Sequence, residues 1–283
     1  MKQKAISIFL VLIGFDIILW LFIVFGPGLI PGLYFFNIGQ GDSELIIFPG
    51  GITMLIDGGP NSSVLKNLSA LLPVQDRYLD LVVMSHPQLD HFGGLIDVLK
   101  QYEVGAFIGS GRAGTTASFN ALSEVIQDKQ ISYVQLKEGD LIRMGEAVVT
   151  VLAPSPLEWE SKELNDTALV FLIQTPEYRA LYTGDIGANV EARLVRDYNL
   201  KANVLKVGHH GSRFSSSDLF LAEVLPDIAV IEVGKNSYGH PTPAALGRLS
   251  KWAQAIFRTD QNGLVKIETK NNILNVSALS LQP

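Results

Sequence analysis

The chain contains few histidines, and they are not scattered. The five histidines are His86, His91, His209, His210 and His240. Each lies in a short run with glycine or aspartate that follows, directly or closely, an apolar strand-like segment. A single histidine is usually a solvated or hydrogen-bonded side chain, but a whole set at strand ends favours a site for chemistry. Imidazole is a common metal ligand and a common acid or base near neutral pH.

Three aspartates occupy the same kind of position. Asp57 in LIDGG, Asp90 in SHPQLDH and Asp185 in LYTGD each follow a strand-like run or close a turn. Any one of them could merely cap its turn, but with the histidines they form a ligand set for Zn, Mn or Fe. The chain has no cysteine, so histidine, carboxylate and amide groups must hold any metal, and no thiolate can act as a nucleophile.

Composition sets the scale of the fold that must position these residues. The 283 residues are 47% hydrophobic, which suffices for one large domain with an extensive core. The net charge is −6, and no basic tail or stripe indicates a nucleic-acid surface. The sequence also lacks an evident aromatic and basic groove of the kind that binds single strands.

The N-terminal segment differs in composition from the rest of the chain. Residues 5–25 are almost entirely apolar, and at about 1.5 Å per residue they span roughly the 30 Å of a bilayer core. We expect residues 1–25 to form an uncleaved membrane anchor, with a cleaved signal peptide as the alternative. Lys2 and Lys4 precede the span, which places the N-terminus in the cytoplasm. The expected location is therefore a single-pass membrane protein whose catalytic domain is extracytoplasmic.

Residues 26–32 are rich in glycine and proline and are the expected linker. Strands are expected near 33–39, 43–48, 52–57, 79–86, 104–109, 131–136, 140–144, 147–154, 167–175, 178–185, 202–210, 228–234, 254–260 and 264–270, and helices near 90–102, 189–198, 217–225 and 243–253. Two comparable halves of strands and helices predict that residues 33–283 form one α/β domain. The expected architecture is an αββα sandwich, with two mixed sheets packed together and helices outside.

Eight motifs, in order, carry a resemblance to a known family. They are NIGQGDS (37–43), LIDGG (55–59), SHPQLDHFGGL (85–95), NDTALV (165–170), LYTGD (181–185), VLKVGHHGSRFSSS (204–217), NSYGHP (236–241) and RTDQNG (258–263). Together they resemble the metallo-β-lactamase-fold hydrolases, and within them the extracytoplasmic domain of the ComEC competence family. HHGS followed by YGHP is the pair that points to the ComEC-like branch.

The resemblance implies a centre with one or two divalent ions, Zn or Mn, at the lip between the sheets. The metal ligands carried over by motif are His86, Asp90, His91, Asp185 and His209, with Asp185 as the bridging group. The catalytic set comprises Asp57, Asp90, His210 and His240. In this set Asp57 orients a ligand or the water. His210 is expected to contact the substrate or transition state, and His240 to be a further ligand or a proton donor.

Two residues depart from the family pattern. Gln88 stands where the wider family has histidine and the ComEC-like branch usually has aspartate. Its neutral carbonyl oxygen is a weak ligand for Zn and suits harder ions such as Mn or Mg. Asn37 replaces an aspartate of the branch, whereas Asn165 is common there. One metal position is therefore expected to be weakened, and a degenerate, metal-free binding module stays open as an alternative.

Hydrolysis is the reaction that this set of residues favours. A metal at an open site lowers the pKa of bound water from 15.7 to about 7, and no G-x-S-x-G nucleophile motif competes. The resemblance implies a phosphodiesterase or nuclease acting on DNA, with Lys206, Ser212 and Asn165 as expected substrate contacts. A single span cannot conduct DNA, so a separate channel or competence protein is an expected partner. Hydrolysis of another bond, such as a lactone, is the second alternative.

Overall fold

The computed structural model describes residues 8–17, 20, 28–73, 77–271 and 273–279. The chain divides into two units, Met1–Ile30 and Pro31–Pro283. In the first unit, residues 8–17 are helical. Among the described residues, no helix has both the length and the apolar character that crossing a bilayer requires. The expected anchor over residues 1–25 falls partly outside the described ranges, and it stays a prediction.

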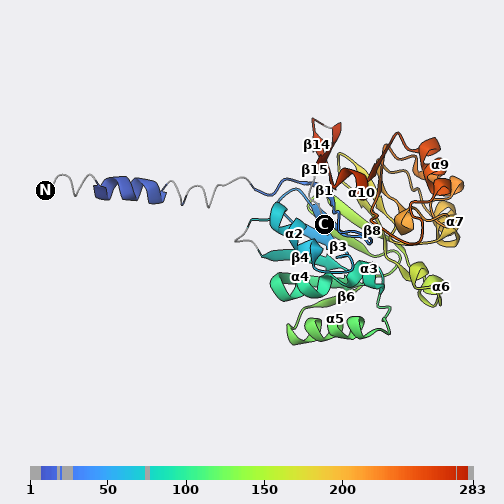
Figure 1. The fold of residues 1–283 in the computed structure, drawn as a ribbon, viewed down its shortest axis with the longest axis horizontal. Helices are drawn as coiled ribbons and strands as arrows, with labels where there is room; N and C mark the ends of the chain where they lie inside the picture. The colour runs from blue at the N-terminus through green and yellow to red at the C-terminus, as the bar shows by residue number, and fades with distance from the viewer. Residues whose placement is uncertain (1–7, 18–19, 21–27, 74–76, 272, 280–283) are drawn as a thin grey trace. The chain divides into compact units, whose positions relative to one another are not determined.

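The second unit is built on two β-sheets (Figure 1). The first contains, in spatial order, β15 (Ile273–Leu279), β14 (Leu264–Lys270), β1 (Gly32–Phe35), β2 (Glu44–Ile47), β3 (Thr53–Ile56), β4 (Tyr78–Val83), β5 (Glu103–Gly109) and β6 (Tyr133–Gln135). The second contains β13 (Ala255–Arg258), β12 (Ile228–Ile231), β11 (Val204–Lys206), β10 (Arg179–Tyr182), β9 (Val170–Gln174), β8 (Ala147–Ala153) and β7 (Leu141–Met144). The predicted pair of mixed sheets with helices is confirmed.

Each sheet joins an antiparallel part to a parallel part. In the first sheet β15, β14, β1, β2 and β3 pair antiparallel, and β3 to β6 pair parallel. In the second sheet β7 to β10 are antiparallel, and β10 to β13 are parallel. Since parallel strands end at the same edge, the loops after β3, β4, β10 and β11 are the ones that the fold can gather into one site.

The main core lies between the two sheets. It combines inward-facing side chains of both sheets, among them Phe35, Ile46, Phe171 and Val230, all fully buried. The rings of Phe35 on β1 and Tyr182 on β10 stack with centroids 5.8 Å apart, which joins the sheets directly. Because both faces of the central strands are covered, β1, β2 and β3 are buried along their whole length rather than at alternate residues.

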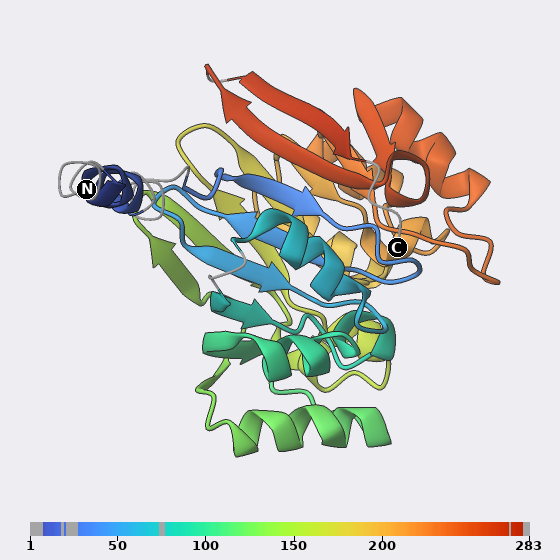
Figure 2. The ribbon, with the colours of Figure 1, turned by 60° about the vertical axis from the view of Figure 1, so that its left-hand side comes forward.

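Helices cover the outer faces. α2 (Ser63–Leu71), α4 (Leu95–Gln101) and α5 (Ala117–Asp128) lie beside the first sheet, and α7 (Ala188–Asp197), α8 (Asp218–Val224) and α9 (Pro243–Trp252) pack on the second (Figure 2). Shorter elements are α3 (Leu89–Phe92), α6 (Pro156–Trp159), α10 (Thr259–Asn262) and the 3-10 turns η1 (Leu164–Thr167) and η2 (Gly208–Gly211). The strand-and-helix pattern had not indicated α2 or α5.

One expected strand ends earlier in the structure and one expected helix is interrupted, and both changes lie next to the candidate site. The strand expected over 79–86 ends at Val83, and the helix expected over 90–102 is divided into α3 and α4 at Gly93 and Gly94. A Cβ on either glycine would collide with backbone carbonyls of the loop over 58–61. The N–H of Gly58 donates to His91 O at 2.6 Å, so the close approach fixes this loop against α3.

Candidate metal centre

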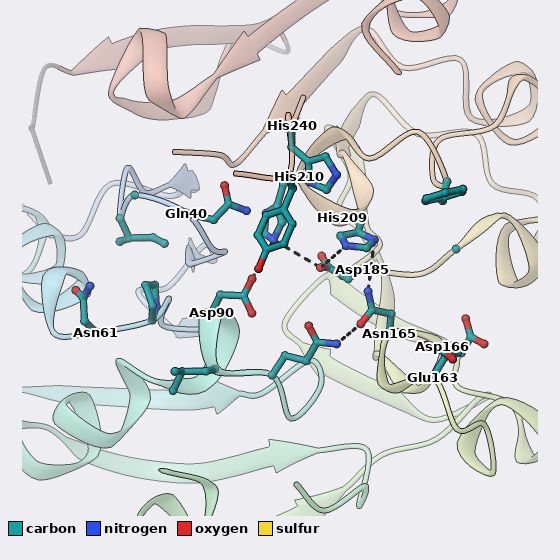
Figure 3. Close-up of a pocket in the computed structure, with 18 residues that line it drawn as sticks. Gln40, Asn61, Asp90, Glu163, Asn165, Asp166, Asp185, His209, His210 and His240 are labelled. Carbon is teal, nitrogen blue, oxygen red and sulfur yellow. Dashed lines mark hydrogen bonds and ion pairs between the residues drawn. The ribbon is translucent and has the colours of Figure 1, made fainter. Parts of the chain in front are cut away.

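Loops from both sheets meet at one edge of the sandwich (Figure 3). Asp57 follows β3 and His86 follows β4, while Asp185 follows β10 and the pair His209 and His210 follows β11. β3 is parallel to β4, and β10 is parallel to β11, so each pair of strands ends at the same edge of its own sheet. Packing the sheets face to face then brings the two pairs of loops together. The sequence motifs thus converge because of the topology.

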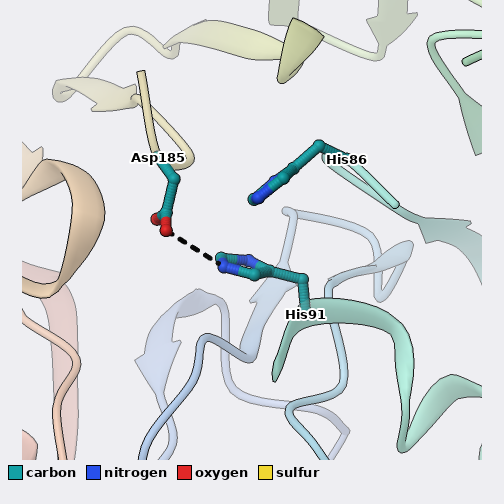
Figure 4. A group of neighbouring side chains, drawn as sticks. All are labelled: His86, His91 and Asp185. Atoms are coloured by element: carbon teal, nitrogen blue, oxygen red, sulfur yellow. Dashed lines mark ion pairs between the residues drawn. The ribbon is translucent and has the colours of Figure 1, made fainter. Parts of the chain in front are cut away.

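Four polar atoms at this edge are buried and, among the described residues, lack a hydrogen-bond partner. They are Nε2 of His86, His91 and His210, and Oδ1 of Asp185. The side chains of His86, His91 and Asp185 offer atoms that lie within 4.8 Å of one another (Figure 4). Nε2 of His91 lies 3.4 Å from Asp185 Oδ2, and Nε2 of His210 lies 3.6 Å from it.

This arrangement fits a divalent cation. A buried polar group without a partner costs about 1–3 kcal/mol, so four of them at one point would be expensive in an empty core. A single ion accepts lone pairs from imidazole and carboxylate together, and this donor set suits Zn, Mn or Fe. The cluster is therefore consistent with divalent metal binding.

The carboxylate of Asp57 fixes the orientation of two of these imidazoles. Its Oδ2 lies 2.8 Å from His91 Nδ1 and accepts a hydrogen bond of 2.6 Å from Ser85 Oγ. Ser85 has one hydroxyl hydrogen, and it goes to Asp57, so Nδ1 of His86 at 3.0 Å must donate to the Ser85 oxygen. The Nε2 atom of His86 is then left unprotonated and directed to the centre, as a metal ligand requires, and Nε2 of His91 becomes free for a metal once its proton is released.

The electrostatics of the three imidazoles differ. Burial lowers the pKa of His86 to about 4, so this side chain is neutral at pH 7. Burial also acts to lower the pKa of His91 and His210, but Asp185 with Asp57 or Asp42 outweighs it, raising the pKa of His91 well above its usual range and that of His210 to about 10. In the absence of an ion these two histidines hold protons, which metal binding would release.

Asp42 is a site residue that the sequence interpretation did not assign. It is fully buried, and its Oδ1 lies 3.1 Å from His210 Nδ1, which also donates to Glu232 O at 3.0 Å. The ammonium of Lys206 contacts the other Asp42 oxygen and donates to Gly184 O at 3.0 Å. Asp42 thus supports His210 as Asp57 supports His91. Its place in the glycine-rich turn GQGD was the available signal, but nothing in the turn shows that it faces a histidine.

The structure places His210, rather than His209, inside the buried cluster. Both residues have positive φ, 50° and 53°, so the chain turns sharply and the two rings diverge. His210 is buried, with Nε2 3.4 Å from Asp90 Oδ2, whereas the His209 side chain is 32% exposed and its Nε2 is 3.9 Å from Asp185. The sequence had assigned His209 to the metal and His210 to the substrate. Of the two, His210 belongs to the groups of possible metal ligands among the described residues, both line the cavity, and the two roles stay predictions.

The side of the centre near Gln88 is made of neutral groups. Gln88 Nε2 donates a hydrogen bond to Asn165 Oδ1, and Asn165 Nδ2 lies 3.4 Å from His209 Nδ1. Figure 3 shows Asn165 facing His209 on this side. The three side chains therefore contact one another, and the expected weakness of this metal position stays a prediction.

A cavity of about 900 Å³ opens above the cluster. Of the expected substrate contacts, Asn165 and His210 line it. Lys206 and Ser212 are buried and lie outside the lining, so their placement does not fit the predicted role. His240 lines the cavity, and its loop is closed by Asn236, which accepts from His240 N at 3.0 Å and donates to His240 O at 2.8 Å.

Two further carboxyl groups lie beneath the centre. Glu44 and Glu232 are fully buried, and together with Asp42 they offer oxygens within 4.8 Å of one another. Burial raises the pKa of Glu44 to about 8 and that of Glu232 well above its usual range. Burial therefore favours the protonated form of both carboxyl groups. Glu44 begins an apolar strand, and a polar residue at that place was its only sequence signal.

Replacing Asp57 by asparagine is expected to weaken metal binding about 10- to 100-fold, because the carboxylate that sets the His91 and His86 tautomers is lost. The measurement is competition for Zn²⁺ against a chromogenic chelator. Asp80→Asn is the matched control, since Asp80 is a partly buried carboxylate that bonds Thr53 away from the centre. Equal Zn²⁺ affinity in the two variants would show that Asp57 does not act on the ligands.

Replacing Glu44 by glutamine is expected to reduce the decrease in stability that accompanies a rise in pH. The pKa of Glu44 is raised from 4.5 to about 8 in the folded protein, so its bound proton contributes fully to stability below pH 4.5. This contribution is lost as the pH rises from 4.5 to about 8. The free energy of unfolding of the variant should therefore rise relative to that of the wild type by a few kcal/mol between about pH 5 and about pH 8. This follows from about 1.4 kcal/mol per unit of pKa shift. Urea titration measures it. Exposed Glu103→Gln is the control, and identical pH trends in both would refute the assignment.

Comparison with known proteins places this geometry in a family. The family model described as "Beta-lactamase superfamily domain" matches residues 53–210, more than half of the chain. The metallo-beta-lactamase fold protein YhfI from Bacillus subtilis superposes with a TM-score of 0.56 at 13% identity, over 83% of this chain and 99% of that one. At that identity the likeness concerns the fold.

Competence proteins are similar in sequence. ComE operon protein 3 of Bacillus subtilis (strain 168) is 28% identical over 84% of this chain and 33% of its own length. Competence protein ComA of Neisseria gonorrhoeae is 32% identical over 67% of this chain and 25% of its own length. The chain thus spans a third or less of these relatives. It belongs to the beta-lactamase superfamily, has the metallo-beta-lactamase fold, and is distantly related to these competence proteins.

Proposed function

We propose that this chain is a metal-dependent phosphodiesterase that cuts DNA. The observation that carries the proposal is the convergence of buried, unpartnered ligand atoms of His91, His210 and Asp185, of which Asp185 and His210 line an open cavity. A divalent ion held there would supply Lewis-acid catalysis, polarising a phosphoryl oxygen and making water more acidic. That chemistry is hydrolysis, and the absence of cysteine leaves few competing nucleophiles.

One ion, Zn²⁺ or Mn²⁺, is proposed on the carboxylate side of the cavity. Its ligands would be Asp90, His91, Asp185 and His210, whose oxygens and nitrogens lie 3.4–3.6 Å apart in pairs. His86 adds a nitrogen toward the second position, but Gln88 and Asn165 are engaged with each other there. A second ion would have to break that amide pair and bind mainly neutral groups, so we expect it to be held weakly if at all.

The chain's own residues provide orientation and proton transfer. Asp57 and Asp42 hold the imidazoles from behind, at 2.8 and 3.1 Å. His240 stands at the cavity wall with an Nδ1 that has no hydrogen-bond partner among the described residues. It is therefore placed to exchange a proton with a leaving group, as the sequence interpretation expected, or to add a ligand.

The proposed substrate class rests on the sequence similarity of this chain to named relatives. The relatives include proteins named for competence and, in Haemophilus influenzae, "Recombination protein 2", so a substrate related to DNA is the natural proposal. The predicted anchor would put the enzyme outside the cytoplasm, and a separate channel or competence protein remains the proposed partner. The fold alone does not choose among phosphodiesters, lactones and β-lactams.

The proposal predicts that the purified full chain hydrolyses bis(p-nitrophenyl) phosphate and DNA with Mn²⁺ or Zn²⁺. Asp185→Asn should lower kcat/KM by about 100-fold or more, because a charged ligand near three imidazoles is lost. Glu163→Gln is the matched control: Glu163 lines the same cavity but lies outside the metal clusters of the described residues.

The same preparation is assayed with nitrocefin and acyl lactones. Cleavage of these substrates with the diesters left intact would replace the phosphodiesterase proposal by hydrolysis of another bond. If none of the substrates is cleaved and the chain retains no metal, the alternative of a metal-free binding module replaces the proposal.

A further inference from the structure

The rim of the cavity carries exposed aromatic rings. Phe214 and Tyr238 are 64% and 72% exposed, and both line the cavity. Within the described part of the second unit, the other large exposed aromatic side chains are Tyr78 and Tyr133, at 44% and 47%, and neither lines it. The two most exposed rings in the described part of this unit therefore stand at one opening, although they are 24 positions apart in the sequence.

The loop that carries Phe214 is held from two sides. Glu191 is buried and accepts hydrogen bonds from Ser216 N and, at 2.9 Å, from Ser217 N. Arg248 donates to Ser216 O and Ser215 O, each at 2.7 Å. These bonds hold the backbone that directly follows Phe214, and in this loop conformation the ring is exposed.

The Tyr238 loop is held in a comparable way. Asn236 Oδ1 accepts from Tyr238 N at 3.1 Å and from His240 N at 3.0 Å. The Tyr238 ring lies 5.8 Å from the His240 ring, which in turn lies 5.4 Å from His209. A row of rings thus leads from the rim toward the metal cluster.

Charge around the cavity restricts what these rings can bind. Asp90, Glu163 and Asp166 line it, and the chain carries a net charge of −6. A polyanion therefore gains little from the surface beyond the ion and Arg213, whose guanidinium lies 4.7 Å over the Phe214 ring. Affinity must come mainly from uncharged surface, and every nucleobase has an aromatic face that stacks on such rings.

We propose that Phe214 and Tyr238 form a stacking platform for unpaired nucleobases next to the scissile phosphodiester, so that the substrate is single-stranded DNA. This inference rests on the proposed function and names its substrate class. In a duplex each base face is covered by its neighbours, and exposing one costs unstacking energy. Two rings at separate points of the rim suit bases that are already unstacked.

Binding tests this platform without turnover. Fluorescence anisotropy is measured with the full chain in EDTA, using fluorescein-labelled oligothymidylate, an abasic oligomer of equal length and charge, and a duplex. The wild type should bind oligothymidylate about tenfold or more tightly than the abasic oligomer or the duplex. Phe214→Ala and Tyr238→Ala should each lose about 5- to 100-fold for oligothymidylate and nothing for the abasic oligomer.

Matched variants separate stacking from loop damage. Phe214→Tyr and Tyr238→Phe should retain the preference, and Leu219→Ala, an exposed residue of α8 outside the cavity lining, should leave it unchanged. Equal affinity of the wild type for oligothymidylate and the abasic oligomer, or for the duplex, would overturn the proposal. So would alanine variants that bind like the wild type. Because no hydrolysis is needed, these outcomes are independent of whether the diester assays succeed.

Discussion

The carboxylate of Asp185 facing the Nε2 atoms of His91 and His210 is the contact on which the rest of the site depends. These side chains are buried, and Asp185 Oδ2 lies 3.4 Å from His91 Nε2 and 3.6 Å from His210 Nε2. Such an arrangement is stable only if charge is supplied between them, by protons or by a cation. The raised pKa of both histidines corresponds to charge supplied by protons. The proposed ion corresponds to charge supplied by a cation.

The supports of this contact come from opposite halves of the fold. Asp42 and Asp57 belong to loops of the first sheet, whereas Lys206 and Asp185 belong to the second. Asp42 touches His210 and Lys206 and lies 3.7 Å from His91 Nδ1, so it joins the two halves at the bottom of the site. Packing of the sheets, seen in the stacking of Phe35 on Tyr182, therefore also sets the distances within the centre. Fold stability and metal geometry are coupled through the same interface.

The sequence predicts the architecture and the convergence of the motifs, because strand periodicity and strand-end motifs are local signals. It does not predict which neighbour of an HH pair turns inward: that depends on the positive φ of His209 and His210, which is set by the surrounding loop. Lys206 was expected to contact the substrate, because nothing local in the sequence indicates its burial, which depends on a partner, Asp42, that is distant in sequence. The exposed pair of Phe214 and Tyr238 was missed for the same reason, since each ring stands alone in a polar loop.

The metal content of the full chain, measured by inductively coupled plasma mass spectrometry after equilibration with Zn²⁺ or Mn²⁺ and removal of free ion, tests the central claim most directly. The account predicts about one equivalent per chain, lost in His210→Ala and retained in His209→Ala. A chain that retains no metal, or one that loses it with His209→Ala but not with His210→Ala, would contradict the account.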